Sequence, residues 1–424
     1  MLDIKFIREN TNRVRKALED RGAEFDLSAL VSLDQEHRSI LTELESLRHR
    51  RKNSNSEMTR LKSGGASTVE FIAEMKELSQ KIKQLEAKER ELSAKLAEMC
   101  LDIPNIPDNS APVGKDEKDN VEVKKWGGPP EFGFKPSEHT DIAEKLGILD
   151  FAVAAKLSGS GYAFFRGQGA RLVRGLINFM LDLHTEKHGY TEVFPPFVVN
   201  RECMTGTGQL PKFEDDMYRV ESDDLFLIPT AEVPVTNIHR EEILDGAELP
   251  LYYTAYTACF RREAGSHGKE TRGLVRLHQF DKVELVKFVS PESSSLELEK
   301  LLADAEEVLR LLGLHYRVIS LCTGDLSFAS SKCYDIEVWA PGLGRYLEVS
   351  SCSNFGDFQA RRAGIRCRPG RSEKPVHVHT LNGSGVALPR LLAALLETCQ
   401  REDGSVSIPE PLRPYMGGME SVSR

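Results

Sequence analysis

The chain has 424 residues, of which 40% are hydrophobic and 29% charged, as is ordinary for a globular protein of two or three domains. No run approaches about 18 apolar residues and the amino terminus has no apolar signal segment, so neither a membrane span nor secretion is indicated and a cytoplasmic location is expected. The net charge of −9 argues against bulk attraction to nucleic acid, so such a partner must meet a local basic surface. The eight cysteines form no Cys-x-x-Cys pair, so no zinc is expected and buried thiols are predicted.

The first part of the chain predicts a helical hairpin. Residues 1–25 have the pattern of a short helical cap, and a heptad pattern follows from Leu30 to Leu61 and again from Phe71 to Met99. The predicted seam positions are Leu30, Leu33, His37, Ile40, Leu44, Leu47, Arg51, Ser54, Met58 and Leu61 in the first arm, and Phe71, Met75, Leu78, Ile82, Leu85, Glu89, Leu92, Leu96 and Met99 in the second. Two arms of similar length around Gly64-Gly65 predict an antiparallel pair of helices. Each arm would span about 45 to 50 Å, which leaves little core, so the pair must project.

A basic cluster lies in the first arm, at Arg48-His49-Arg50-Arg51-Lys52, with Arg60 and Lys62 near its tip. Spacing alone favours the solvated flank of a coiled coil. The alternative is that the arm lays these charges along an RNA backbone, which proteins recognise largely through charge and shape.

Residues 101–137 are rich in proline, glycine and charge, and they are predicted to form a linker between a domain at 1–100 and a second domain at 138–424. Early in the second domain a helix is expected, with Leu172, Leu176, Phe179 and Leu183 on one face.

The most informative stretch runs from Tyr252 to Phe288, where two strand-like segments flank a basic loop that contains glycine. Alternation places Arg261 and Glu263 on one face at the end of the first segment. In the second segment, which begins near Leu274, a period of two places these side chains on one face: Arg276, His278, Phe280, Lys282, Glu284, Val286 and Phe288. An aromatic ring for a base, arginines for phosphates and a carboxylate for an ammonium group suit a site for an amino acid and ATP. The alternative is a hairpin with charges on its solvent face.

Three further segments carry candidate ligands. Thr230-Ala231-Glu232 precedes the central hairpin but is too short to be informative alone. Glu348 and Ser351 place a carboxylate and a hydroxyl three residues apart, which suits oxygen coordination of Mg²⁺, although a strand end with polar caps is the alternative. Arg390 opens an apolar helix, where a charge usually needs a partner.

The segment FRREAGSHGKETRGLVRLHQFDKVE closely resembles the second signature of class II aminoacyl-tRNA synthetases, in the wording of the seryl-tRNA synthetases. Two other segments resemble the first and third signatures: SGSGYAFFRGQGARLVRGLINFMLDLHTEKHGYTEVFPP and LNGSGVALPRLLAALLE. The resemblance covers residues 1–413. It implies an α+β fold, with a class II antiparallel β-sheet core flanked by helices and an N-terminal antiparallel helical hairpin.

The same resemblance implies a serine–tRNA ligase, which activates L-serine with ATP and transfers it to the 3′ end of tRNA(Ser). It implies a homodimer through the first signature and a hairpin that grips the long variable arm of the tRNA. Whether a selenocysteine tRNA is also charged stays open.

The resemblance also implies roles for individual residues. Serine would be bound by Thr230, Ala231, Glu232, Glu284, Asn382 and Ser384. ATP would be bound by Arg261, Arg262, Glu263, Phe280, Glu348, Val349, Ser350, Ser351 and Arg390. The catalytic residues would be Arg261, Arg276 and Arg390, with Mg²⁺ held by Glu348 and Ser351. Which of Thr230, Glu232, Glu284 and Ser384 meets the hydroxyl of serine and which the ammonium is not determined by the sequence.

Two residues depart from the family pattern: Pro389 stands where a glycine is expected and Arg262 where a serine is more usual. They are expected to alter packing or loop stiffness and not the reaction. Two other functions remain alternatives, a ligase that charges a carrier protein or small molecule and a non-catalytic RNA-binding scaffold. A class I synthetase is excluded because the sequence has neither His-Ile-Gly-His nor Lys-Met-Ser-Lys-Ser.

Overall fold

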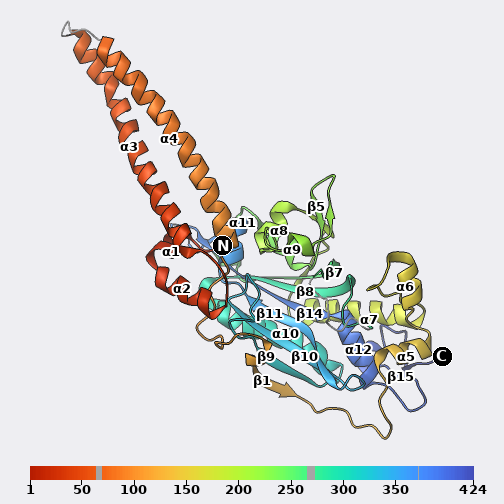
Figure 1. The fold of residues 1–424 in the computed structure, drawn as a ribbon. Helices are drawn as coiled ribbons and strands as arrows, with labels where there is room; N and C mark the ends of the chain where they lie inside the picture. The colour runs from red at the N-terminus through yellow and green to blue at the C-terminus, as the bar shows by residue number, and fades with distance from the viewer. Residues whose placement is uncertain (64–68, 265–272, 371) are drawn as a thin grey trace. The chain divides into compact units, whose positions relative to one another are not determined.

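The computed structural model describes residues 1–63, 69–264, 273–370 and 372–424 (Figure 1). The predicted Gly64-Gly65 turn and most of the basic loop of the central hairpin therefore lie outside the described residues. The chain divides into two compact units, one of Leu2–Glu19 with Ala23–Pro104, and one of Asn105–Arg424 with Met1 and Asp20–Gly22. No helix among the described residues is long and apolar enough to cross a membrane.

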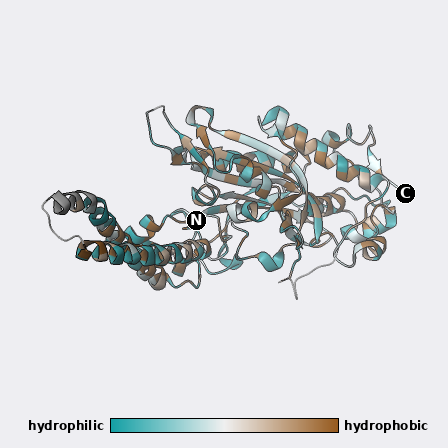
Figure 2. Cartoon of the chain, turned by 90° about the horizontal axis from the view of Figure 1, so that it is seen from above, coloured by the Kyte–Doolittle hydropathy of each residue, from teal (hydrophilic) through white to brown (hydrophobic). Residues whose placement is uncertain are grey.

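The smaller unit contains the predicted helical pair. It consists of α1 (Ile4–Glu9), α2 (Thr11–Asp20), α3 (Leu27–Ser63) and α4 (Val69–Asp102). The heptad positions meet as expected, since Ile40 and Leu44 of α3 are buried in one cluster with Leu78 and Ile82 of α4. Figure 2 shows hydrophilic residues along both long helices, as a two-helix pair with only one packed seam requires.

Polar side chains link the two arms as well. His37 and Glu89, both predicted at seam positions, meet at 3.2 Å between Nε2 and Oε1. Arg48 binds Glu86 at 2.8 Å, and Arg50 binds Glu74, so two residues of the basic cluster are paired with the opposite arm. These pairs are largely exposed, so each contributes little to stability.

The larger unit is built on an eight-stranded sheet. Its strands, in spatial order, are β1 (Val121–Trp126), β9 (Tyr316–Ser320), β10 (Lys332–Ala340), β11 (Arg345–Asn354), β14 (His379–Ala387), β8 (Gln279–Val289), β7 (Leu251–Phe260) and β2 (Thr191–Glu192). Every neighbouring pair is antiparallel except β2 and β7 at one edge. The predicted α+β fold with an antiparallel core is confirmed.

Three helices, α7 (Gln168–Asp182), α10 (Ser294–Leu311) and α12 (Leu388–Thr398), cover one face of this sheet. The alternation of β8 explains this arrangement. Val283 and Leu285 point into the apolar core beneath these helices, while Lys282 and Glu284 lie on the opposite face. The helix face predicted from Leu172, Leu176 and Phe179 is buried in the same core.

The remaining elements surround the sheet. The further helices are α5 (His139–Leu146), α6 (Phe151–Ser158), α8 (Arg201–Thr207), α9 (Glu232–Thr236) and α11 (Phe358–Ala363). The further strands are β3 (Val198–Asn200), β4 (Arg219–Val220), β5 (Leu225–Leu227), β6 (Ile243–Asp245), β12 (Arg366–Arg368), β13 (Val376–His377), β15 (Val406–Ser407) and β16 (Ser421–Val422). Short turns of other helix types are η1 (Glu117–Asp119), η2 (Leu183–Lys187), η3 (Glu214–Asp216), η4 (Asn237–His239), η5 (Gly246–Glu248), η6 (Pro291–Ser293) and η7 (Glu410–Leu412). All eight cysteines are free thiols, and six of them are buried.

The prediction of a linker at 101–137 is wrong for most of that segment. Residues from Asn105 onward belong to the larger unit, and β1 pairs with β9 as the edge strand of the sheet. All six residues of β1 are exposed and three of them are charged, which is how an edge strand avoids pairing with other chains. An exposed, charged edge strand has the same composition as a linker. Composition alone cannot distinguish them, because it does not show whether the backbone groups are paired with another strand.

Candidate active site

A cleft of about 1220 Å³ opens on the sheet face opposite α7, α10 and α12. It brings together most of the residues predicted from the sequence. Those that line it are Thr230, Glu232, Arg261, Glu263, Arg276, Phe280, Glu284, Glu348, Val349, Ser350, Ser351, Asn382, Ser384, Pro389 and Arg390. Ala231 and Arg262 are not among the described lining residues: Ala231 is fully buried, and Arg262 is exposed, with its backbone N–H donating to Asp216 at the cleft.

The ends of the central hairpin differ from the alternation predicted for them. The strand β7 ends at Phe260 and β8 begins only at Gln279, so Arg276 precedes the strand. Glu263 has a φ of 54°, in the left-handed region, so its side-chain direction does not follow strand alternation. Arg276 and Glu263 nevertheless meet at the cleft, with Nη1 and Oε2 2.9 Å apart.

One end of the cleft holds a compact set of buried polar groups. The carboxylate of Glu284 accepts a hydrogen bond from Thr230 at 2.8 Å and forms an ion pair with Lys282 at 2.7 Å. Glu284 is 2% exposed, so its charge needs both partners. Ser384 lies directly opposite Glu284 in the register of β14 and β8. This end is buried and polar, and it offers groups of both signs that suit a small zwitterion.

Glu232 is the second carboxyl group at this end. Gln359 of α11 donates to it at 2.6 Å, and Gln359 in turn accepts from Thr380 at 2.7 Å. Burial and the neighbouring Glu284 raise the pKa of Glu232 to about 7, against the opposing effect of its hydrogen bonds. Glu232 therefore changes charge near neutral pH.

The middle of the cleft carries the aromatic ring and the arginines. The guanidinium of Arg261 lies over the ring of Phe280, 5.1 Å from its centre. Arg390 donates to the carbonyl oxygens of Val275 at 3.0 Å and Glu348 at 2.8 Å, which satisfies the partner predicted for this charge. These contacts hold two positive charges beside a flat ring, an arrangement that suits a nucleotide.

Acidic groups and a hydroxyl lie beside Arg390. Ser351 donates to Glu348 at 3.0 Å, and Asp335 lies opposite Ser351 on the neighbouring strand. Burial and the charge of Glu348 raise the pKa of Asp335. Desolvation by the surrounding protein raises the pKa of Glu348. The charge of Arg390 and the hydrogen bond from Ser351 outweigh this effect, so the pKa of Glu348 lies below its ordinary value. Among the described residues no three His, Cys, Asp or Glu side chains form a metal-binding group.

Lys282 and Asp335 line the cleft and Gln359 supports Glu232, although the sequence did not indicate a site role for any of them. The period-two pattern had placed Lys282 on the correct face, between Phe280 and Glu284, and that position was the available signal. The segment Phe358–Arg362 had the composition of a basic edge near the site, but nothing in it indicated that Gln359 contacts Glu232. No signal was available for Asp335, which comes from a strand distant in sequence.

Family models match both units of the chain. Residues 1–107 match the seryl-tRNA synthetase N-terminal domain, and residues 212–399 match the tRNA synthetase class II core domain (G, H, P, S and T).

Full-length relatives agree with these matches. The chain is 61% identical to the serine–tRNA ligase of Caldanaerobacter subterraneus subsp. tengcongensis over 98% of both chains. It is 58% identical to that of Geobacter sulfurreducens over the whole of both. Among solved structures, it is similar to seryl-tRNA synthetase from Pyrococcus horikoshii complexed with ATP, with a TM-score of 0.95 and 41% identity, covering 100% of this chain and 99% of that one. The chain therefore belongs to the seryl-tRNA synthetase family, the class II ligases that join serine to tRNA and convert ATP to AMP and diphosphate.

Proposed function

We propose that the cleft activates L-serine with ATP at the residues named above, with serine at the Glu284 end and the nucleotide beside Phe280. The observation that carries this assignment is the convergence of Thr230, Glu284 and Ser384 at one buried end of the cleft. The test is ATP–pyrophosphate exchange with each of the twenty amino acids. Exchange that depends on serine alone supports the proposal, and exchange with another amino acid or with none contradicts it.

The chemical step needs no general base. The carboxylate of serine is an anion at neutral pH and attacks the α-phosphorus of ATP, which forms seryl-adenylate and releases pyrophosphate. The phosphate oxygens gain negative charge during the attack, so Arg261, Arg276 and Arg390 act by holding and neutralising them. Their side chains are already fixed by Phe280, Glu263 and the carbonyl oxygens near Arg390, which limits reorganisation during the reaction.

Selection of serine follows from the same buried groups. A carboxylate that accepts a hydrogen bond from the serine hydroxyl rejects alanine, because alanine would leave a buried acceptor unpaired. Threonine must be excluded by the lack of space for its methyl group. Thr230, Asn382 and Ser384 are 5 to 7% exposed, so the surrounding wall has little room to move.

The charge of Glu232 predicts a pH dependence of serine binding. Its pKa of about 7 lies above the ordinary value of 4.5, so Glu232 is mostly neutral below that pH and anionic above it. The anion binds an ammonium or a hydroxyl group more strongly, so the KM for serine is expected to fall between about pH 6 and pH 8. Glu232→Gln is expected to flatten this profile. A profile of the same shape in both proteins would contradict the role.

The group formed by Glu348, Ser351 and Asp335 fits Mg²⁺. Its donors are hard oxygen atoms, and two acidic groups lie close enough for one to raise the pKa of the other, a repulsion that a divalent cation relieves. We infer that Glu348 and Ser351 hold the ion, with Asp335 behind them. When bound, Mg²⁺ would neutralise charge on the phosphate groups of ATP.

This inference predicts the effect of removing one ligand. Glu348→Gln keeps the volume of the side chain but removes its charge, so it is expected to lower exchange by about 10- to 100-fold and to raise the Mg²⁺ concentration needed for half-maximal rate. The measurement is exchange as a function of Mg²⁺ at fixed ATP. Glu420→Gln, which removes a carboxylate paired with Arg413 and absent from the cleft lining, is the control. An unchanged Mg²⁺ requirement in the Glu348 variant would refute the assignment.

The second step transfers serine to the 3′ end of tRNA(Ser). The proposed tRNA contact is the helical pair α3 and α4, whose first arm carries Arg48, Arg51 and Lys52 as exposed residues. We also propose a homodimer formed through the segment that contains α7, and a cytoplasmic location, where tRNA is charged for translation.

A further inference from the structure

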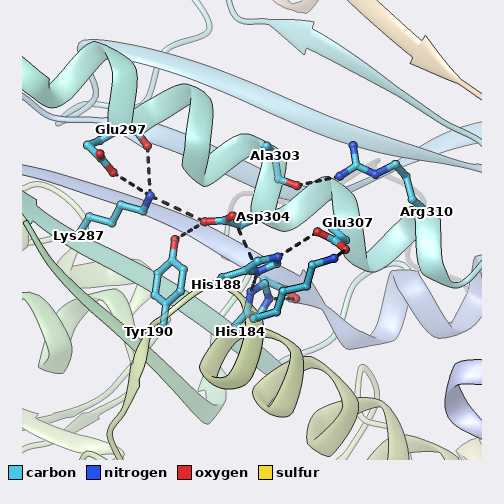
Figure 3. A network of polar contacts seen from close by, with 11 residues as sticks. His184, His188, Tyr190, Lys287, Glu297, Ala303, Asp304, Glu307 and Arg310 are labelled. Atoms are coloured by element: carbon cyan, nitrogen blue, oxygen red, sulfur yellow. Dashed lines mark hydrogen bonds and ion pairs between the residues drawn. The ribbon is translucent and has the colours of Figure 1, made fainter.

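A buried polar network lies on the other side of the sheet, beneath α10 (Figure 3). Lys287 of β8 is 1% exposed and pairs with Glu297 at 3.1 Å and with Asp304 at 3.8 Å. Tyr190 donates to Asp304 at 2.8 Å, and His188 binds Glu307 at 3.1 Å. The catalytic role proposed above uses none of these groups.

One branch of this network reaches the strand that carries Ser384. His184, fully buried in the π-helical turn η2 that follows α7, lies 3.0 Å from His188 between their Nδ1 atoms. Its Nε2 lies 3.3 Å from the carbonyl oxygen of Gly385. The network therefore ends on the backbone of β14, one residue after the side chain that faces the serine end of the cleft.

Gly385 is the extra residue of a β-bulge. In the register of β14 and β8, Ser384 pairs with Glu284 and Val386 with Val283, and Gly385 has no counterpart. A Cβ atom on Gly385 would lie 2.8 Å from Nε2 of His184, so the ring fills the space beside the bulge. The preceding carbonyl, that of Ser384, accepts a hydrogen bond from Ser350 at 2.6 Å. Side chains thus hold two successive carbonyl groups of the bulge.

The positions of the ring hydrogens in the branch formed by His184 and His188 follow from the groups that accept them. A carbonyl oxygen only accepts, so Nε2 of His184 carries the hydrogen donated to Gly385. Burial lowers the pKa of His184 to about 3, so the ring is neutral and its Nδ1 is an acceptor. Nδ1 of His188 is then the donor between the rings, and its Nε2 lies 3.1 Å from Oε2 of Glu307 on α10. The contact with His188 on one side and with Gly385 on the other therefore fixes the orientation of the His184 ring.

We propose that His184 is a positioning residue for the serine end of the cleft, which it shapes by fixing the bulge of β14 and hence the place of Ser384. The inference rests on the proposed role of Ser384 in serine binding. The bulge turns Ser384 toward Glu284 and Val386 into the core, so a shift of Gly385 moves the wall that contacts serine. The nucleotide end, built from Phe280, Arg261 and Arg390, does not depend on this contact.

The test compares variants in ATP–pyrophosphate exchange with the full-length protein. His184→Leu keeps most of the volume but removes the donor, and it is expected to raise the KM for serine about tenfold while the KM for ATP stays near that of the unmodified protein. The ratio of serine to threonine activation is expected to fall, because a displaced wall excludes the methyl group less well. His184→Gln retains an N–H donor and is expected to recover most of the serine affinity.

Tyr316→Phe is the matched control. It removes a buried hydrogen bond to the same helix α10, at Glu306 and 3.0 Å long, from strand β9, which β10 and β11 separate from β14 and Gly385. It is expected to lower Tm while leaving the KM for serine and the threonine ratio unchanged. A merely structural role for His184 predicts that both variants lose stability and that neither changes serine affinity selectively.

The outcomes separate this inference from the proposed function. If the unmodified protein shows no serine-dependent exchange, the proposed function fails. If that exchange is present but His184→Leu leaves the KM for serine unchanged, or changes both KM values equally, the positioning role is refuted. Gly385→Ala disturbs the same contact from the side of the strand and is expected to raise the KM for serine in the same way. This variant tests the positioning role if His184→Leu does not fold.

Discussion

Replacing Arg390 by alanine is expected to lower serine-dependent ATP–pyrophosphate exchange by about 100- to 1,000-fold. Its guanidinium is held by the carbonyl oxygens of Val275 and Glu348, beside the proposed nucleotide position, and it opens the apolar helix α12. A fixed charge stabilises the developing charge on phosphate more than a mobile one does, because no reorganisation is required. The loss should therefore appear mainly in kcat/KM for ATP.

Two further variants sharpen this result. Arg390→Lys keeps the charge but cannot make both carbonyl contacts with a planar group, so it is expected to recover only part of the activity. Arg401→Ala removes an exposed arginine that binds Ser407 away from the cleft, and its exchange rate should match that of the unmodified protein. A full rate in Arg390→Ala, with the protein folded, would show that the phosphate groups lie elsewhere.

Shortening the helical pair is expected to abolish most tRNA charging while sparing serine activation. Replacing residues 41–84 by a short glycine–serine turn removes the outer part of both arms and keeps the contact of His37 with Glu89. Aminoacylation of tRNA(Ser) should fall on the order of 1,000-fold, since the lost surface carries the basic cluster that includes Arg48 and Arg51. Pyrophosphate exchange uses only the cleft of the larger unit and should persist.

Ionic strength provides an independent check on this prediction. If the arm binds RNA through phosphate contacts, the KM of the full-length protein for tRNA should rise steeply with salt, while the KM for serine should not. Retained aminoacylation in the shortened protein would contradict the role of the arm. Loss of both activities would show that the arm is also needed for the cleft, which the division of the chain into two compact units argues against.

The helical pair was predictable because the residues of its core recur at a regular spacing within each helix. A heptad repeat identifies the residues that pack against the partner helix. Four of the buried residues, Ile40, Leu44, Leu78 and Ile82, are at the predicted positions. The pairing of Arg48 with Glu86 was not predicted, because side chains of adjacent antiparallel helices meet across the turn and the sequence of one arm does not report them.

The cleft was predictable to a different degree. Alternation correctly placed Phe280, Lys282 and Glu284 on one face of β8, since a period of two is a property of the strand itself. At Glu263 and Arg276 the strands have already ended and the backbone turns, so alternation does not apply there, although both side chains line the cleft. Arg262 was predicted from the resemblance and lies outside the cleft lining, although its neighbour Arg261 lies over Phe280.

The sequence by itself determined the family, the antiparallel sheet core, the helical pair and a set of site residues most of which line the cleft, because these depend on periodicity and on motifs contiguous in the chain. Only the tertiary structure decided that β1 belongs to the sheet, that Asp335 lines the cleft, that Gln359 contacts Glu232, and that His184 contacts Gly385. The physical reason is that these contacts join residues far apart in sequence. Their partners are chosen by packing of the sheet and its helices, and no local pattern records that choice.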